Sequence, residues 1–299
     1  MAVLDTVADR QAQWSETANH LKSTIDDARW WVFALSVAGA ILAAVASQMG
    51  GPATDAATIS IGNPRSWVAI AAAVSLAFAT FFTSRLLGSE HVTDWVRARA
   101  ISERLKREAF RFAAAAAPYD DPNRAKAELA LDDERKKIED DGVDLLGKQV
   151  AATGKGSLPR GPLTQDEYIA RRVKAQIEWF NPKADKYQAI AARLRTIELI
   201  LAAAATLITA VASVAGKSVL WGVSFDFAAI TAVLTTIAAA VLTHVEASRY
   251  DFLVMTYRAT ARRLQDRANR SHVPWSDFVN DCENFLAAEN ASWIAKWTK

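Results

Sequence analysis

The sequence predicts an all-α integral membrane protein, with four transmembrane helices arranged as two hairpins and with long cytosolic helices. The prediction depends on four stretches almost free of charge: residues 30–49, 67–87, 198–215 and 225–246. A helix needs about 20 apolar residues to cross the hydrocarbon core of a bilayer. Helices are expected rather than strands because they satisfy their own backbone groups in lipid. Tryptophans mark the ends of these stretches, as in an interfacial aromatic belt: Trp30, Trp31, Trp67 and Trp221.

A soluble bundle with buried, alanine-rich helices is the alternative fold. Core helices of soluble bundles seldom contain four uncharged runs of this length. The helix 30–49 also places small residues such as Gly39 and Ala40 where two helices can approach closely in lipid. We therefore expect these helices to pack against protein in a multi-helix assembly.

The distribution of Lys and Arg predicts the orientation. The basic residues in the links 50–65 and 216–224 are Arg65 and Lys217 alone. The opposite flanks of the four stretches are rich in both Lys and Arg. The positive-inside rule then places both termini and the central segment in the cytoplasm. The net charge of +2 gives no indication of nucleic-acid binding, and the single cysteine, Cys282, excludes an internal disulfide framework.

An internal repeat organises the chain. The pattern Arg-Ala-x-x-x-Arg-Leu occurs at 99–105 and again at 258–264, each time after a membrane-length apolar run. It predicts a helix-hairpin-helix unit at 1–117, an acidic helical insert and linker at 118–163, and a second helix-hairpin-helix unit at 164–299. In the second copy no Pro or Gly separates the membrane helix from the basic helix that it leads into.

Several local patterns predict further helices. Apolar residues at 3-4 spacing predict a coiled-coil seam or a supercoiled bundle, and the helix is expected to continue into the first membrane helix: Leu4, Val7, Gln11, Trp14, Ala18, Leu21, Ile25 and Ala28. Thr164 and Glu167 form a capping box that opens a helix, and Asn181-Pro182 is expected to break it. Residues 118–152 are either a solvated acidic face or a partner-docking surface. An amphipathic helix is expected after Pro274, with these residues on its apolar face: Phe278, Cys282, Phe285 and Trp293.

No pattern in the chain indicates catalysis. The four histidines (His20, His91, His244 and His272) have no metal-ligand spacing, and the linker at 153–163 does not match a phosphate-binding loop. We therefore expect neither an enzyme nor a bound cofactor or metal.

Polar side chains inside the membrane helices are the candidate pore-lining residues. On the fourth helix they form one stripe: Thr231, Thr235 and Glu246. On the third they lie within about a quarter of the circumference: Glu198, Thr206, Thr209 and Ser213. Rings of Glu favour cations in pores, and Asp226 is a candidate for an outer ring, although it projects from the side opposite Thr231. The alternative is that the hydroxyls only pack or bond their own helix.

The second half also resembles a known family. After its hairpin come SRYDFLVMTYRATARRLQDRA and WSDFVNDCENFLAAENASWIAKW. These segments are similar to the SLATT domain, the SMODS and SLOG-associating two-transmembrane effector domain. The first half, with WVRARAISERLKREAFRF, resembles another subtype of the same superfamily, so that the chain looks like a tandem two-hairpin member.

The resemblance implies an oligomeric pore or ion channel in the bacterial inner membrane, acting as a conflict or antiphage effector. Its partners would be the lipid bilayer, further copies of the chain, permeant ions and a separate nucleotide-sensing or nucleotide-making protein. The alternative function is a non-conducting membrane scaffold or protein-interaction module. In the pore hypothesis the second hairpin lines the pore and the first packs around it.

Overall fold

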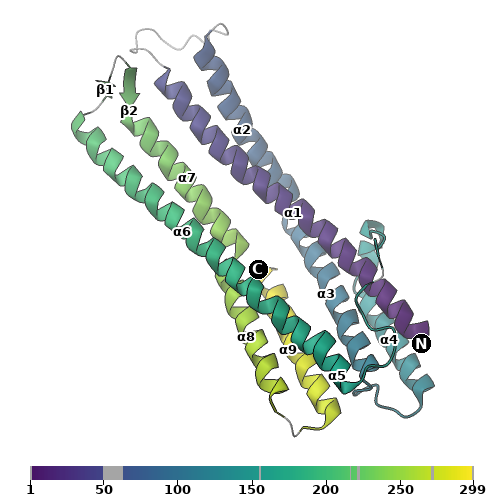
Figure 1. Cartoon of the computed structure of the whole chain (residues 1–299). Helices are drawn as coiled ribbons and strands as arrows, with labels where there is room; N and C mark the ends of the chain where they lie inside the picture. Colours follow the sequence, from purple (N-terminus) through teal and green to yellow (C-terminus); the bar gives the residue numbers. More distant parts are fainter. Residues whose placement is uncertain are drawn as a thin grey trace. The chain divides into compact units, whose positions relative to one another are not determined.

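The computed structural model describes residues 2–49, 63–154, 156–215, 217–220, 223–270 and 273–297 (Figure 1). Most of the link 50–65 lies outside the described residues, as do Trp221 and His272. The described elements follow in chain order: α1 (Ala2–Gln48), α2 (Pro64–Leu86), α3 (Ser89–Ala113), α4 (Arg124–Asp140), η1 (Val143–Lys148), α5 (Gln165–Tyr168), η2 (Ile169–Lys174), α6 (Ala175–Ala215), β1 (Lys217–Leu220), β2 (Val223–Asp226), α7 (Phe227–Ser248), α8 (Tyr250–Ala268) and α9 (Trp275–Trp297). The predicted all-α class is confirmed. The exception is a short antiparallel hairpin of β1 and β2, which begins in the expected loop 216–224 and ends at Asp226, two residues into the expected fourth membrane stretch.

The chain divides into two compact units. The apolar unit comprises Asp26–Leu87 and Tyr187–Asp251, and the polar unit comprises Met1–Ile25, Gly88–Lys186 and Phe252–Lys299. Four helices, within α1, α2, the α5–α6 segment and the α7–α8 segment, are long and apolar enough to cross a membrane. Only 6% to 17% of each apolar window is buried within the single chain. These windows therefore expose apolar surface that a lipid bilayer or other copies of the chain would cover.

In the apolar unit, α1 and α2 approach closely at Gly39. A Cβ atom on this glycine would lie 2.8 Å from the side chain of Leu76 and 3.3 Å from the carbonyl oxygen of Ala72. A larger residue at this position would displace the Leu76 side chain, so glycine suits the place where the two helices approach, as expected for small residues at membrane-helix contacts.

The N-terminal seam and the first membrane stretch form one helix, as predicted, because α1 runs without interruption from Ala2 to Gln48. Seven of the eight seam positions are buried, and Leu21 is partly exposed. Within the polar unit the seam packs against the same chain, where Gln11 Nε2 donates a 3.0 Å hydrogen bond to Ser102 Oγ of α3. These contacts favour a bundle within one chain over a coiled coil in which the seam would pack against another chain.

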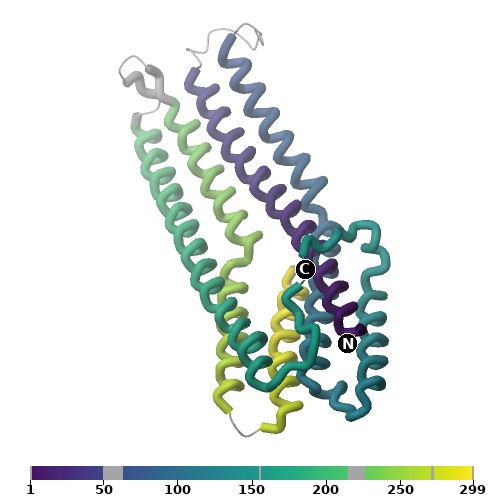
Figure 2. The backbone as a smooth tube through the Cα atoms, turned by 45° about the vertical axis from the view of Figure 1, so that its right-hand side comes forward, coloured from purple at the N-terminus to yellow at the C-terminus, as the bar shows by residue number. Residues whose placement is uncertain are grey.

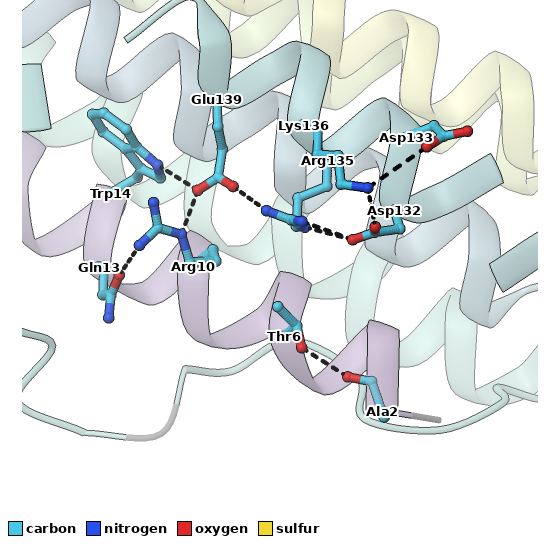
Figure 3. A network of polar contacts seen from close by, with 10 residues as sticks. All are labelled: Ala2, Thr6, Arg10, Gln13, Trp14, Asp132, Asp133, Arg135, Lys136 and Glu139. Carbon is cyan, nitrogen blue, oxygen red and sulfur yellow. Dashed lines mark hydrogen bonds and ion pairs between the residues drawn. The ribbon is translucent and has the colours of Figure 1, made fainter. Parts of the chain in front are cut away.

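Glu139 of α4 binds the polar part of α1, as Figure 3 shows. It accepts a 3.2 Å hydrogen bond from Trp14 Nε1 and forms ion pairs with Arg10 and Arg135. Part of the acidic stretch 118–152 is therefore used inside the polar unit. The network also explains why Trp14 is fully buried with its N–H satisfied.

The expected break at Asn181-Pro182 is wrong. Pro182 lies inside α6, whose continuous course can be followed in Figure 2. A proline removes one helical hydrogen bond and costs about 3 kcal/mol in a helix interior. Here Phe180 and Ala184 on either side are buried in the polar unit. Burial of this face on both sides of the proline offsets the local cost, so the helix continues.

The membrane helix and the basic helix of the second copy are separate helices. Helix α7 ends at Ser248, and Arg249 adopts a left-handed conformation with φ 51° before α8 begins. The N–H of Arg249 donates to the carbonyl oxygens of Val245 and Glu246, which closes the last turn of α7. The first copy breaks at the corresponding place, since α2 ends at Leu86 and Gly88 precedes α3. Both repeats thus end the membrane helix before the polar helix starts.

Candidate functional site: the polar residues of the apolar unit

Three candidate residues of α6 expose hydroxyl groups that donate to their own helix. Thr206 Oγ1 donates to the carbonyl oxygen of Ala202 at 2.9 Å, and Thr209 Oγ1 to that of Ala205 at 2.8 Å. Ser213 Oγ donates to the carbonyl oxygen of Ala210 at 2.7 Å. Because each hydroxyl has one hydrogen, its remaining capacity is as an acceptor. The exposed face of α6 therefore presents oxygen acceptors.

Helix α7 has the same arrangement. Thr231 Oγ1 donates to the carbonyl oxygen of Phe227 at 3.1 Å, and Thr235 Oγ1 donates to that of Thr231 at 3.0 Å. Thr235 is exposed and Thr231 is partly exposed. The structure brings one pair from the two helices together, because Thr209 Oγ1 lies 3.4 Å from Thr231 Oγ1.

The three acidic candidates occupy different environments. Glu246 is exposed near the end of α7, and Glu198 is partly exposed on α6. Arg195, three residues before Glu198 on α6, forms an ion pair with Asp251. Asp226 is the N-cap of α7, and its carboxylate accepts a 3.2 Å hydrogen bond from the N–H of Ala229. Its side chain therefore has a local structural role at the start of α7.

Sequence reasoning missed a link between the two hairpins. The side chain of Gln48 on α1 donates to the carbonyl oxygen of Asp226 at 3.0 Å and accepts from its N–H at 2.9 Å. Near the other end of the apolar unit, the rings of Phe33 and His244 lie 5.6 Å apart. Helix α1 of the first hairpin thus contacts the second hairpin at two places. A glutamine at the end of an apolar run was the only available sequence signal.

A buried ion pair in the polar unit was also missed. Arg172 donates to both carboxylate oxygens of Glu283, at 2.9 and 2.7 Å, and Tyr168 Oη donates to the same carboxylate at 2.9 Å. Arg172 and Glu283 are 2% and 0% exposed. Burial acts to lower the pKa of Arg172, but the charge and hydrogen bonds of Glu283 outweigh it and raise the pKa. The guanidinium of Arg172 therefore stays charged, and its hydrogen bonds to Glu283 hold η2 against α9.

The neighbouring Cys282 is buried beside this pair. Burial, aided by the adjacent Glu283, raises the pKa of its thiol to about 12. A thiol with so little thiolate is a poor nucleophile or metal ligand. Among the described residues, no group of three or more His, Cys, Asp and Glu side chains is placed to hold a metal ion.

Comparison with known families identifies two regions of the chain. Residues 168–293 match the family model of the SMODS and SLOG-associating 2TM effector domain 1, SLATT_1. Residues 12–127 match DUF4231, described as a protein family of unknown function. No curated protein and no solved structure matches the chain. With four helices able to cross a membrane and this family match, the chain is a membrane protein that contains a SLATT domain.

Proposed function

We propose that the protein is the subunit of an oligomeric, cation-conducting pore in the bacterial inner membrane, where it acts as an effector in a conflict or antiphage system. The family description, an effector domain with two transmembrane segments, supports the effector role. The sparse burial of the apolar windows within one chain supports association with lipid and further copies. Both termini face the cytoplasm in this proposal because Lys and Arg flank the inner ends of the hairpins.

One observation favours cation conduction above the others. The hydroxyl hydrogens of Thr206 and Thr235 are bonded within their helices, while the side chains are exposed. Such hydroxyls offer lone pairs outward, which suits a partly dehydrated cation better than an anion. From Glu198 to Ser213 the face extends about 22 Å along α6 at 1.5 Å per residue, and Glu198 and Glu246 add negative charge at its inner end. A separate nucleotide-sensing or nucleotide-making protein is the proposed trigger.

Isosteric replacement of the hydroxyls tests this assignment. Thr206→Val with Thr235→Val removes two acceptors while keeping side-chain volume, and should lower cation conductance about tenfold, equivalent to a barrier about 1.4 kcal/mol higher. Thr80→Val is a matched control, because Thr80 on α2 is also exposed and bonded to its own helix at 3.0 Å. Conductance that falls equally in the control, or in neither variant, would remove these threonines from the pore.

A non-conducting scaffold is the second candidate function. The contact of 3.4 Å between Thr209 Oγ1 and Thr231 Oγ1 favours it, since it lets Thr209 donate to the neighbouring helix in place of its own bond to Ala205. In that case the polar faces only stabilise helix packing. An oligomer whose axis is closed by packed side chains, together with unaltered lipid permeability, would support the scaffold over the pore.

A further inference from the structure

The membrane-length helices of the apolar unit lie side by side in one row, in the order α6, α7, α1 and α2 (Figures 1 and 2). Helix α6 contacts α7 where Thr209 lies 3.4 Å from Thr231. The two hairpins meet between α7 and α1, where Gln48 bonds the backbone of Asp226. Helix α1 then approaches α2 at Gly39. The row therefore begins with α6 and ends with α2.

Each end of the row exposes a stripe of large apolar side chains. By helical geometry the stripe on α6 lies opposite Thr209, and the stripe on α2 lies opposite Ala72, the residue next to Gly39. A spacing of seven residues is typical of the seam between two packed helices. Both stripes have this spacing, and each member is at least 46% exposed: Ile200, Leu207 and Val214 on α6, and Trp67, Val74 and Phe81 on α2.

The contact between the two hairpins indicates which helix fits each end of the row. The chain contains two hairpins, α1–α2 and α6–α7, each followed by a polar helix, α3 or α8. Within the chain, the first helix of one hairpin, α1, contacts the second helix of the other, α7. The remaining combination of this kind joins the first helix α6 to the second helix α2, and these are the two ends of the row. A second copy at either end would therefore repeat a contact that the chain already makes within itself.

The register of the contact inside the chain predicts the register between copies. The ring of Phe33, 15 residues before the end of α1, lies 5.6 Å from the ring of His244, 18 residues after the N-cap of α7. The same two counts lead to Ile200 on α6 and to Phe81 on α2. Both residues belong to the exposed stripes. The exposed residues at the two ends of the row are thus the ones that a repeated contact would bury.

We propose that the α6 stripe of one copy packs against the α2 stripe of the next copy, as a head-to-tail interface. The two helices run antiparallel, as α1 and α7 do, so steps of seven residues define the pairs: Ile200 with Phe81, Leu207 with Val74, and Val214 with Trp67. Such an interface uses two different surfaces, so the row continues from copy to copy until it closes into a ring. Lipid alone would cover the stripes without requiring a matched register. This inference rests on the proposed oligomer and names the surfaces that build it.

Cysteine cross-linking of the full chain in liposomes tests the interface. The single natural cysteine is first removed by Cys282→Ala. Ile200→Cys and Phe81→Cys in the same chain should then give a ladder of covalent oligomers with a bifunctional maleimide, because each copy offers its two thiols to different neighbours. Either cysteine alone should give no covalent product, and a mixture of the two single-cysteine chains should give dimers. Thr80→Cys in place of Phe81→Cys is the matched control and should give no ladder, since Thr80 is exposed on another side of α2.

Truncation of one side chain tests the same contact without a cross-linker. Phe81→Ala should weaken association of the copies in detergent about tenfold, as expected for a large aromatic side chain inside an interface. Thr80→Ala should leave association unchanged. Because both side chains are exposed in the single chain, neither change should unfold it, and thermal unfolding of each variant verifies this. Equal association of the two variants would count against the interface.

The cross-linking result also separates the interface from conduction. Dimers formed by one single-cysteine chain would indicate contact between like edges and would overturn the head-to-tail interface. A cross-link confined within one chain would show that the row closes on itself, with the same consequence. Ion flux without a ladder would overturn the interface and leave the pore standing. A ladder without ion flux would support the interface and count against the pore.

Discussion

The side chain of Gln48 forms two hydrogen bonds with the backbone of Asp226, one to its carbonyl oxygen and one from its N–H. A single amide thereby joins the end of α1 to the start of α7, although 178 residues separate them in sequence. The same residue, Asp226, caps α7 through its carboxylate. The two hairpins of the apolar unit are therefore tied together where α1 ends and α7 begins.

Replacing Gln48 should loosen this link. Gln48→Leu keeps the side-chain size but leaves the N–H and the carbonyl oxygen of Asp226 without their partner. We expect a loss of about 1–3 kcal/mol in the free energy of unfolding, measured by thermal unfolding in detergent. Ser47→Ala is the neighbouring control, because the hydroxyl of Ser47 donates to its own helix, at the carbonyl oxygen of Ala44. Equal stability of the two variants would show that the link contributes nothing.

Breaking the buried pair of Arg172 and Glu283 should have a larger effect. Glu283→Ala leaves a buried guanidinium without its carboxylate, which costs about 3–5 kcal/mol. Asp185→Ala removes an exposed partner of Arg258 and should cost at most about 1 kcal/mol. The double variant Arg172→Met, Glu283→Leu should recover much of the loss, because two apolar side chains need no charge compensation. Thermal unfolding in detergent measures all three. A Glu283→Ala variant as stable as Asp185→Ala would contradict this account of the pair.

The stability of the polar unit should depend on pH through Glu289. Burial outweighs the opposing charge of Arg99 and, with Glu103 nearby, raises the pKa of Glu289 from its usual 4.5 to about 7. A carboxyl group with a raised pKa contributes stability that is complete below pH 4.5 and is lost as the pH rises through 7. The loss in the free energy of unfolding is about 3 kcal/mol, because each unit of pKa difference corresponds to about 1.36 kcal/mol.

Thermal unfolding at pH 4.5 and pH 8 checks this expectation. Between pH 4.5 and pH 8, the free energy of unfolding of the unaltered protein should fall by about 3 kcal/mol more than that of Glu289→Gln. The reason is that the variant cannot ionise at this position. Asp277→Asn should follow the unaltered protein, since Asp277 is exposed on the same helix. The same pH dependence in Glu289→Gln would assign the effect to another group.

Sequence periodicity predicted the helical elements because burial of apolar faces dominates their formation. The uncharged runs, the buried seam of α1 and the capping box at Thr164 are all local patterns, and the structure contains each of them. Repeat boundaries at 117 and 163 remain a prediction. The compact units of the structure group residues by polarity instead, so they neither support nor oppose those boundaries.

The features that sequence reasoning missed depend on tertiary contacts. Pro182 breaks a helix by local rules, but burial of Phe180 and Ala184 maintains α6. The break at Arg249 has no Gly or Pro to mark it. Arg172 and Glu283 are 111 residues apart, so no local spacing could indicate their pairing. The pore-lining assignment stays a prediction for the same reason, because it depends on contacts between copies of the chain.

Ion flux through vesicles that contain only the purified protein is the most direct test of the central claim. Potassium-loaded liposomes with the reconstituted chain should release K⁺ faster than protein-free liposomes under an applied voltage. Glu246→Gln should shift the reversal potential toward lower cation preference, because it removes negative charge at the proposed inner mouth. Flux equal to that of protein-free vesicles, at every voltage and with the proposed partner protein added, would contradict the pore and leave the scaffold as the function.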